Sequence, residues 1–202
     1  MNEKGLDEPQ KKGAGEDFVG MDRGQGRNDF GSAKMLARSG SNRWHNLIVA
    51  NTAIAAGSKM HGHKCEIYIS NMRVKLANNF LCYPDIVFVN GEPKFADGNA
   101  DLLLNPTVVV EIFSSTTNTV DKTKKVESFL EMESIRECVL LKEDEMRVEH
   151  YARQNQKQWI YRIYNERDDV VSLESIGCKI GLAEIYAQIK FRTAEFASRA
   201  VN

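Results

Sequence analysis

The run at residues 107–113, Thr-Val-Val-Val-Glu-Ile-Phe, most constrains what this chain of 202 residues can fold into. It is the most β-branched run in the sequence, and β-branched residues favour strands. A second run at 85–89, Asp-Ile-Val-Phe-Val, ends at the turn dipeptide Asn90-Gly91. Because both runs are continuously apolar rather than alternating, they predict two strands that are buried on both faces of a sheet.

Weaker patterns predict further elements on either side of these two strands. Alternation of apolar and charged residues at 72–76 is typical of a half-buried strand. Other short β-like runs lie at 66–69, 137–141, 147–153, 159–164 and 170–173. Helical spacing of apolar residues predicts helices from a cap at Ser41-Asn42 to a point before Gly62, over about 120–132, and over 182–189. The order of elements predicts an α/β (α+β) fold, with a mixed β-sheet flanked by helices.

The first 34 residues differ in composition from the rest of the chain. Seven glycines there are interleaved with charged and amide side chains, and the apolar residues lack periodicity. Such a composition is typical of a poorly ordered or divergent leader. We therefore expect one domain over residues 35–202.

Composition and charge narrow the class of protein. No apolar stretch is long enough to span a membrane, and no signal-peptide core follows the first residues, so we expect a cytoplasmic protein without a membrane partner. The four cysteines are far apart and His61-Gly-His63 lacks partners, which argues for reduced, partly buried thiols and against structural zinc. The net charge of −1 argues mildly against a strong nucleic-acid binder.

Two carboxylates occupy costly positions in the predicted strands. Asp85 opens an apolar strand directly after Pro84, and Glu111 lies inside the β-branched run. An unpaired carboxylate in such a setting costs several kcal/mol or shifts its pKa. A divalent cation offsets that cost well, and Mg²⁺ typically binds one or two carboxylates together with water and phosphate oxygens.

A cation is also expected near these carboxylates, to stabilise charge on a phosphate. Because side chains alternate along a strand, Val109, Glu111 and Phe113 share one face, so the residue two after Glu111 carries no charge. The next cations along the chain are those of the following helix, Lys122, Lys124 and Lys125. A lysine on its flexible stem can reach back over the sheet to the carboxylates.

The ordered motif resembles the PD-(D/E)XK nuclease superfamily, and within it the restriction-endonuclease-like family known as Uma-two. The resemblance rests on Met72-Arg-Val-Lys, Tyr83-Pro84-Asp85, Asn105-Pro106 leading into Glu111-Ile-Phe-Ser114, and Asp121-x-x-x-Lys125-x-x-x-Phe129. It covers roughly residues 36–189. Ser115 stands where the family often has proline and Phe129 where it often has tyrosine. The family's acidic-Gly-acidic segment before the position of Ala37 has no match here.

The resemblance implies a restriction-endonuclease-like fold and a metal-dependent endonuclease that hydrolyses DNA phosphodiester bonds. In that reading Asp85, Glu111 and the backbone carbonyl of Ile112 hold Mg²⁺ or Mn²⁺. Lys125 orients or deprotonates the attacking water, or stabilises charge on the phosphate. DNA is then the expected partner, and a homodimer is expected because nucleases that cut both strands are often two-fold symmetric.

Other readings of the same residues stay open at the level of sequence. Asp85 can cap a turn, Glu111 can pair with Arg73 or Lys75, and Lys125 can be a solvated helix lysine. Trp44 and His45 are expected to pack the first helix. The neutral net charge and the unmatched N-terminal segment favour a second function, that of a catalytically inactive nuclease fold acting as a binding or assembly module.

Overall fold

The computed structural model describes residues 42–60, 64–77, 80–96, 98, 100–115, 117 and 119–191, without the side chain of Asp121. The predicted leader at 1–34 and the loop at His61-Gly-His63 lie outside these residues. The N-terminal segment that the family resemblance leaves unmatched also lies outside them.

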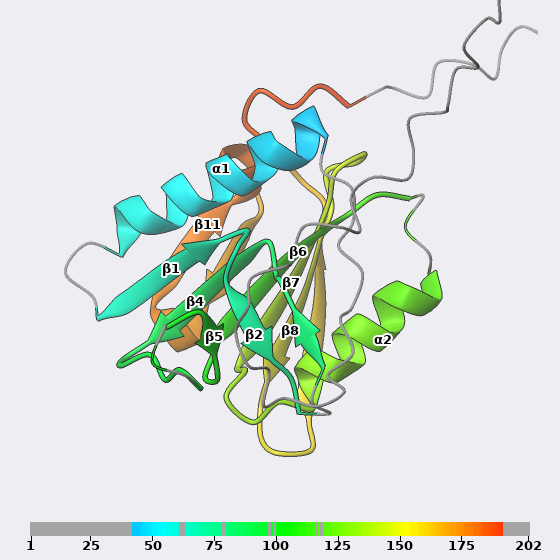
Figure 1. The fold of residues 1–202 in the computed structure, drawn as a ribbon. Coiled ribbons are helices and arrows are strands. Elements are labelled where there is room, and N and C mark those ends of the chain that lie inside the picture. The colour runs from blue at the N-terminus through cyan, green and yellow to red at the C-terminus, as the bar shows by residue number, and fades with distance from the viewer. Residues whose placement is uncertain are drawn as a thin grey trace, which may run out of the picture. The chain divides into compact units, whose positions relative to one another are not determined.

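A mixed sheet of six strands forms the centre of the fold, as the sequence predicted (Figure 1). Its strands, in spatial order, are β1 (Cys65–Ile69), β4 (Ile86–Asn90), β6 (Val108–Phe113), β7 (Glu137–Lys142), β8 (Val148–Arg153) and β9 (Trp159–Tyr164). Only the central pair β6 and β7 is parallel, and the other neighbours are antiparallel. A parallel pair needs a crossover connection, which here carries helix α2 (Thr119–Leu130).

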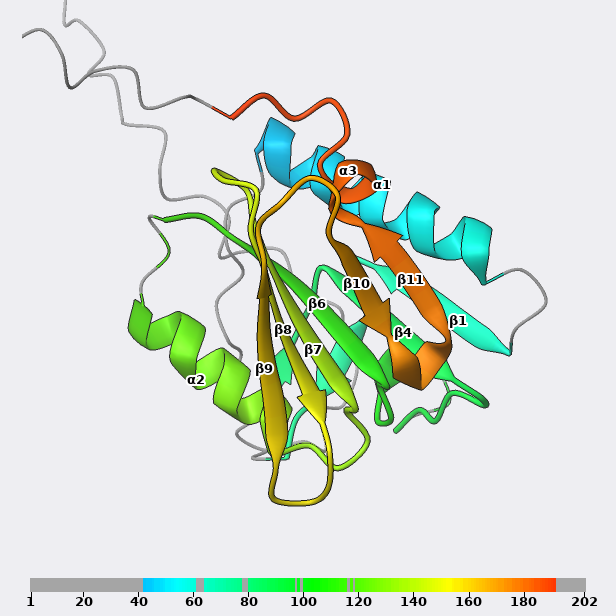
Figure 2. The ribbon, with the colours of Figure 1, turned by 180° about the vertical axis from the view of Figure 1, so that it is seen from behind.

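Smaller elements cover the two faces of this sheet. One face carries α1 (Arg43–Lys59), the hairpin of β10 (Val170–Leu173) and β11 (Cys178–Gly181), the 3-10 turn η1 (Glu174–Ile176) and α3 (Leu182–Ile185) (Figure 2). The other face carries α2 and a three-stranded sheet of β2 (Arg73–Lys75), β3 (Leu81–Cys82) and β5 (Leu102–Leu103). The sequence did not predict β3, β5 and β11, and the final helix ends at Ile185 rather than at 189.

The central strands separate two apolar cores. Val108, Val110 and Ile112 of β6 face the core shared with α1 and the hairpin. Val109 and Phe113 face the core shared with α2 and the small sheet. All six residues of β6 are buried, so the prediction of a strand covered on both faces is confirmed. Glu111 lies between Val109 and Phe113 on the same face of β6 and is therefore on the α2 side.

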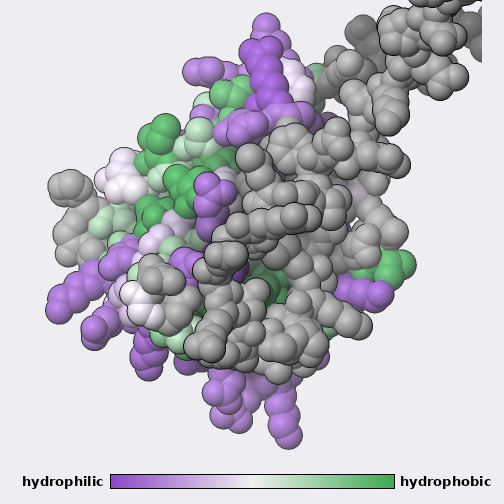
Figure 3. Space-filling view, viewed as in Figure 1, coloured by the Kyte–Doolittle hydropathy of each residue, from purple (hydrophilic) through white to green (hydrophobic). Residues whose placement is uncertain are grey.

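Hydrophobic side chains on the surface gather mainly over α1 and β1 in the view of Figure 3. Ile54 of α1 and Ile69 of β1 are among the exposed large hydrophobic residues of this part of the chain. Within the residues that the structure describes, no helix is both long enough and apolar enough to span a membrane.

Candidate active site

The Asp85 carboxylate lies where the antiparallel pairing of β4 and β6 ends. Ile86 pairs with Val110, so Asp85 and Glu111 lie one residue farther along the same two strands. Pro84 has no N–H to continue a backbone ladder. Beyond this point a side chain replaces the backbone as the hydrogen-bond partner of β6. Asp85 Oδ2 accepts the Ile112 N–H at 2.9 Å. Asp85 is only 5% exposed and is therefore fixed at the start of the strand.

His45 of α1 contacts the second oxygen of Asp85. Its Nε2 lies 3.1 Å from Asp85 Oδ1, and both side chains are buried. The side-chain oxygen of Asn42 accepts the N–H groups of Trp44 and His45, so the predicted helix cap also orients the residue that reaches Asp85. The sequence predicted a packing role for His45, with a DNA contact as the alternative, and did not predict a contact with Asp85. Its place three residues after a helix cap gave no indication of its partner, which lies 40 positions away in the chain.

Glu111 lies against Lys125, as the family resemblance implied. Lys125 Nζ is 2.6 Å from Glu111 Oε1, and the two side chains are 12% and 2% exposed. The alternative pairing of Glu111 with Arg73 is wrong, because Arg73 pairs with Asp101. The reading of Lys125 as a solvated helix lysine is also wrong. A helix that crosses back over the sheet has brought this lysine to the buried carboxylate.

The three lysines of α2 have different positions. Lys125 reaches Glu111, whereas Lys122 reaches Glu149 of β8 at 3.1 Å, and Lys124 is exposed. Residues three apart lie on the same face of a helix, so Lys122 and Lys125 both point toward the sheet. Glu111 and Glu149 flank Leu140 on the two strands beside it, so the two ion pairs lie next to each other.

Burial dominates the electrostatics of the Glu111–Lys125 pair. Burial raises the pKa of Glu111 to about 7, although the charge of Lys125 lowers it, and the charge of Asp85 raises it further. Burial lowers the pKa of Lys125, but the Glu111 carboxylate outweighs this and leaves that pKa above its ordinary value. Lys125 therefore stays protonated at neutral pH. This favours a role in stabilising negative charge over a role as a base.

The pKa of His45 is also set by opposing effects. Burial lowers it, whereas the contact with Asp85 and the negative charges of Asp85, Glu143 and Glu111 raise it above its ordinary value. A protonated His45 balances part of the negative charge on Asp85. Neither ring nitrogen of His45 makes a hydrogen bond of suitable geometry among the described residues, so the 3.1 Å approach of Nε2 to Asp85 is an ion-pair contact.

The oxygen donors at this place fit a hard divalent cation. Asp85 and Glu111 supply two buried carboxylates from neighbouring strands, and burial raises the pKa of Glu111 although Lys125 lies against it. No group of three or more His, Cys, Asp or Glu residues with the geometry of a metal site occurs in the described ranges. Mg²⁺ does not need such a group, since it usually retains several waters. A role for the Ile112 carbonyl stays a prediction.

None of the four cysteines forms a disulfide. All four are free thiols; Cys82, Cys138 and Cys178 are buried, and Cys65 is half-buried. This confirms the prediction of reduced, partly buried thiols. Burial and the nearby charge of Glu111 raise the pKa of Cys82 to about 12, so this thiol stays protonated beside the site.

Comparison with solved structures identifies the class of fold. A crystal structure described as a putative nuclease belonging to DUF820, from Anabaena variabilis, superposes with a TM-score of 0.62. The match covers 74% of this chain and 84% of that one at 17% identity. The mixed sheet with its flanking helices is thus a nuclease-like fold, as predicted.

Sequence comparison then gives the family. The model of the Uma2 family, described as "Putative restriction endonuclease", matches residues 26–183, and the chain belongs to this family. Two relatives from Synechocystis sp. carry the names "Uncharacterized protein sll1609" and "Uncharacterized protein slr1290". The first is 26% identical over 66% of this chain and 76% of its own length. The second is 22% identical over 82% and 86%.

Proposed function

We propose that this protein is a metal-dependent endonuclease that hydrolyses phosphodiester bonds of DNA. The observation that carries the proposal is the buried Glu111–Lys125 contact of 2.6 Å beside Asp85. A structural ion pair needs no third charged group, and here a second buried carboxylate lies on the adjacent strand. Family membership supports the same reading.

Each residue has a distinct role in this proposal. Asp85 and Glu111, with the Ile112 carbonyl, would hold Mg²⁺ or Mn²⁺. When bound, the ion supplies Lewis-acid stabilisation of phosphate charge and makes water more acidic. The Lys125 ammonium orients the attacking water and stabilises negative charge that builds on the phosphate. His45 acts through Asp85, because its Nε2 contact and the Ile112 N–H together fix both carboxylate oxygens.

Nicking of supercoiled plasmid DNA with Mg²⁺ or Mn²⁺ tests this function. The wild-type protein should convert the plasmid to nicked and linear forms. The triple variant D85N/E111Q/K125M should not, because it lacks both carboxylates and the cation. EDTA should abolish cleavage by the wild type. Equal residual cleavage by the wild-type and variant proteins would overturn the proposal, whereas DNA binding without cleavage would support the inactive binding module instead.

We further propose that the protein acts on DNA in the cytoplasm as a homodimer. Strand β9 is at the edge of the six-stranded sheet and pairs with β8 alone among the described strands. Its Tyr161 and Ile163 are exposed by 47% and 44%. An edge strand with unpaired backbone groups and exposed apolar side chains can add a second strand. A second copy of this chain would pair there around a two-fold axis.

A further inference from the structure

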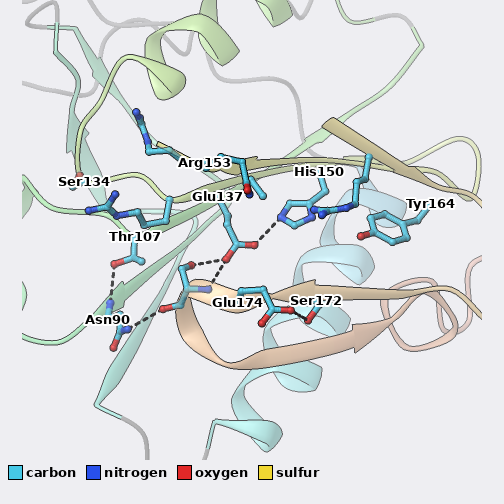
Figure 4. Close-up of a pocket in the computed structure, with 14 residues that line it drawn as sticks. Asn90, Thr107, Ser134, Glu137, His150, Arg153, Tyr164, Ser172 and Glu174 are labelled. Atoms are coloured by element: carbon cyan, nitrogen blue, oxygen red, sulfur yellow. Dashed lines mark hydrogen bonds and ion pairs between the residues drawn. The ribbon is translucent and has the colours of Figure 1, made fainter. Parts of the chain in front are cut away.

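A polar cavity lies on the opposite face of the sheet from Glu111. Its volume is about 790 Å³, and it opens between β7, β8 and β9 on one side and the β10–η1 segment on the other (Figure 4). His150 of β8 pairs with Val139 of β7, and Val139 faces the core shared with α1 and the hairpin. We call this cavity the hairpin pocket, defined by Ser134, Arg136, Glu137, His150, Arg162 and Ser175.

A buried carboxylate forms the floor of the hairpin pocket. Glu137 Oε1 accepts hydrogen bonds from the N–H and the hydroxyl of Ser175 at 2.7 and 2.6 Å. Glu137 Oε2 lies 2.7 Å from His150 Nε2, and the two side chains are 3% and 1% exposed. Figure 4 shows these contacts converging on Glu137. Glu137 is thus fully satisfied by the protein and holds the His150 ring in one orientation.

Two residues that line the pocket each carry a buried polar atom without a partner in the described part of the chain. His150 Nδ1 and Ser134 Oγ are buried without a hydrogen bond to any described residue. Because the Glu137 carboxylate accepts the Nε2–H of His150, Nδ1 carries a lone pair in the neutral ring and a proton in the charged ring. A buried polar atom without a partner destabilises the structure, because it has lost its hydrogen bonds to water. A ligand that both donates and accepts hydrogen bonds would satisfy the ring in either state.

Arginines give the pocket its positive charge. Arg162 of β9 pairs directly with His150, so its side chain lies on the same face of the sheet. Arg136 is exposed at the rim of the pocket. Burial lowers the pKa of Arg153, and the charge of Arg136 lowers it further. Arg153 itself donates to the carbonyls of Leu130, Met132 and Ile135, which fixes the loop that carries Ser134. Arg136 and Arg162 are therefore left to attract an anion.

We propose that the hairpin pocket binds a phosphate monoester of nucleotide size. A phosphate group accepts charge-assisted hydrogen bonds from arginine, and in its monoprotonated form it also donates one. The volume of the hairpin pocket falls in the range of small-molecule sites, roughly 300–1,000 Å³, and exceeds what inorganic phosphate needs. Three arginines line the pocket against the two carboxylates of Glu137 and Glu174, which leaves an excess of one positive charge. This site is independent of the proposed nuclease function.

Calorimetric titration with adenosine monophosphate, adenosine and inorganic phosphate tests the proposal. The monophosphate should bind with a Kd of roughly 1 mM or tighter, inorganic phosphate more weakly, and adenosine not measurably. The Nδ1 signal of His150 in nitrogen-detected NMR should shift on addition of the monophosphate. His150 itself is left intact, because its removal would leave the buried Glu137 without a partner.

Variants of exposed residues keep the test free of folding effects. Arg136→Ala and Arg162→Ala should each weaken binding of the monophosphate by about tenfold, the loss expected for one charge-assisted hydrogen bond. Arg167→Ala removes the same charge at an exposed position outside the pocket and should leave binding within twofold. E111Q should bind as the wild type does. Absence of binding, equal binding of adenosine, or unchanged binding in both pocket variants would overturn the proposal.

Discussion

Among the carboxylates of the described residues, Glu111 is the one whose pKa burial raises above its ordinary value. Its carboxylate is 2% exposed, and burial raises its pKa to about 7 from an ordinary value of 4.5. The folded state therefore binds the proton more tightly than the unfolded state does. By linkage, the contribution of Glu111 to stability is complete below about pH 4.5 and is lost as the pH rises toward 7.

We predict that Glu111→Gln removes this pH dependence from the metal-free protein. Between pH 5 and 8 the free energy of unfolding of the wild type should fall, relative to the variant, by on the order of 2–3 kcal/mol. Urea unfolding at a series of pH values in EDTA measures the difference. Glu127→Gln, at an exposed position of the same helix as Lys125, is the control and should follow the wild type. Parallel curves for the wild type and E111Q would contradict the raised pKa.

His45 is a positioning residue, because it acts on the site through Asp85. We predict that His45→Ala lowers the nicking rate by about 10- to 100-fold, as is usual when the partner of a metal-binding carboxylate is removed. His45→Gln should recover part of the loss, since its amide can donate to the same oxygen. Nicking rates of the three proteins, measured over a range of Mn²⁺ concentrations, test this. If the alanine and glutamine variants behave alike, His45 has a packing role only.

At the scale of elements, α2 determines which cation reaches the carboxylates. Three lysines lie within four residues of one another, and the rotation of the helix separates them into one buried ion pair, one half-buried ion pair and one exposed side chain. Phe113 occupies the strand position two after Glu111, so the cation has to come from the helix. Lys122 lies 5.5 Å above the Phe113 ring and is bound to Glu149.

We predict that Lys125→Met abolishes most of the cleavage, whereas Lys124→Met does not. The first change removes the charge beside Glu111 and should lower the nicking rate by about 100-fold or more. The second removes the same charge from an exposed position of the same helix and should leave the rate within twofold. Circular dichroism of both variants checks that the helix is retained. Similar cleavage by the two variants would remove Lys125 from the site.

The strands that were not predicted from the sequence are short. β3 and β5 have two residues each, so neither can show a period of two, and both form only because β2 lies between them. β11 contains Cys-Lys-Ile-Gly, and its pairing with β10 is set by the turn at η1, where Gly177 adopts a left-handed φ of 62°. The predicted final helix ends early at Ile185, and the next residue, Tyr186, donates a hydrogen bond from its hydroxyl to the carbonyl of Arg147.

At the scale of the whole molecule, β9 is the sheet edge on which the proposed dimer depends. Light scattering coupled to size exclusion should give twice the mass of the chain for the wild type. Ile163→Lys places a charge on this edge and should shift the protein to the monomer mass. Ile54→Lys makes the same change at a site on α1 that is 70% exposed, and should remain dimeric. A monomeric wild type, or a dimeric I163K, would reject pairing through β9.

The sequence by itself determined the two central strands, the faces of β6 and the costly positions of Asp85 and Glu111. These follow from local chemistry, because β-branched runs favour strands and side chains alternate along them. Only the tertiary structure decided which side chains contact Asp85 and Glu111, and where a pocket forms. His45, Lys125 and the hairpin pocket depend on how α1, α2 and the β10–β11 hairpin cross the sheet. Contacts between residues that are far apart in sequence are set by packing of whole elements, which no local pattern records.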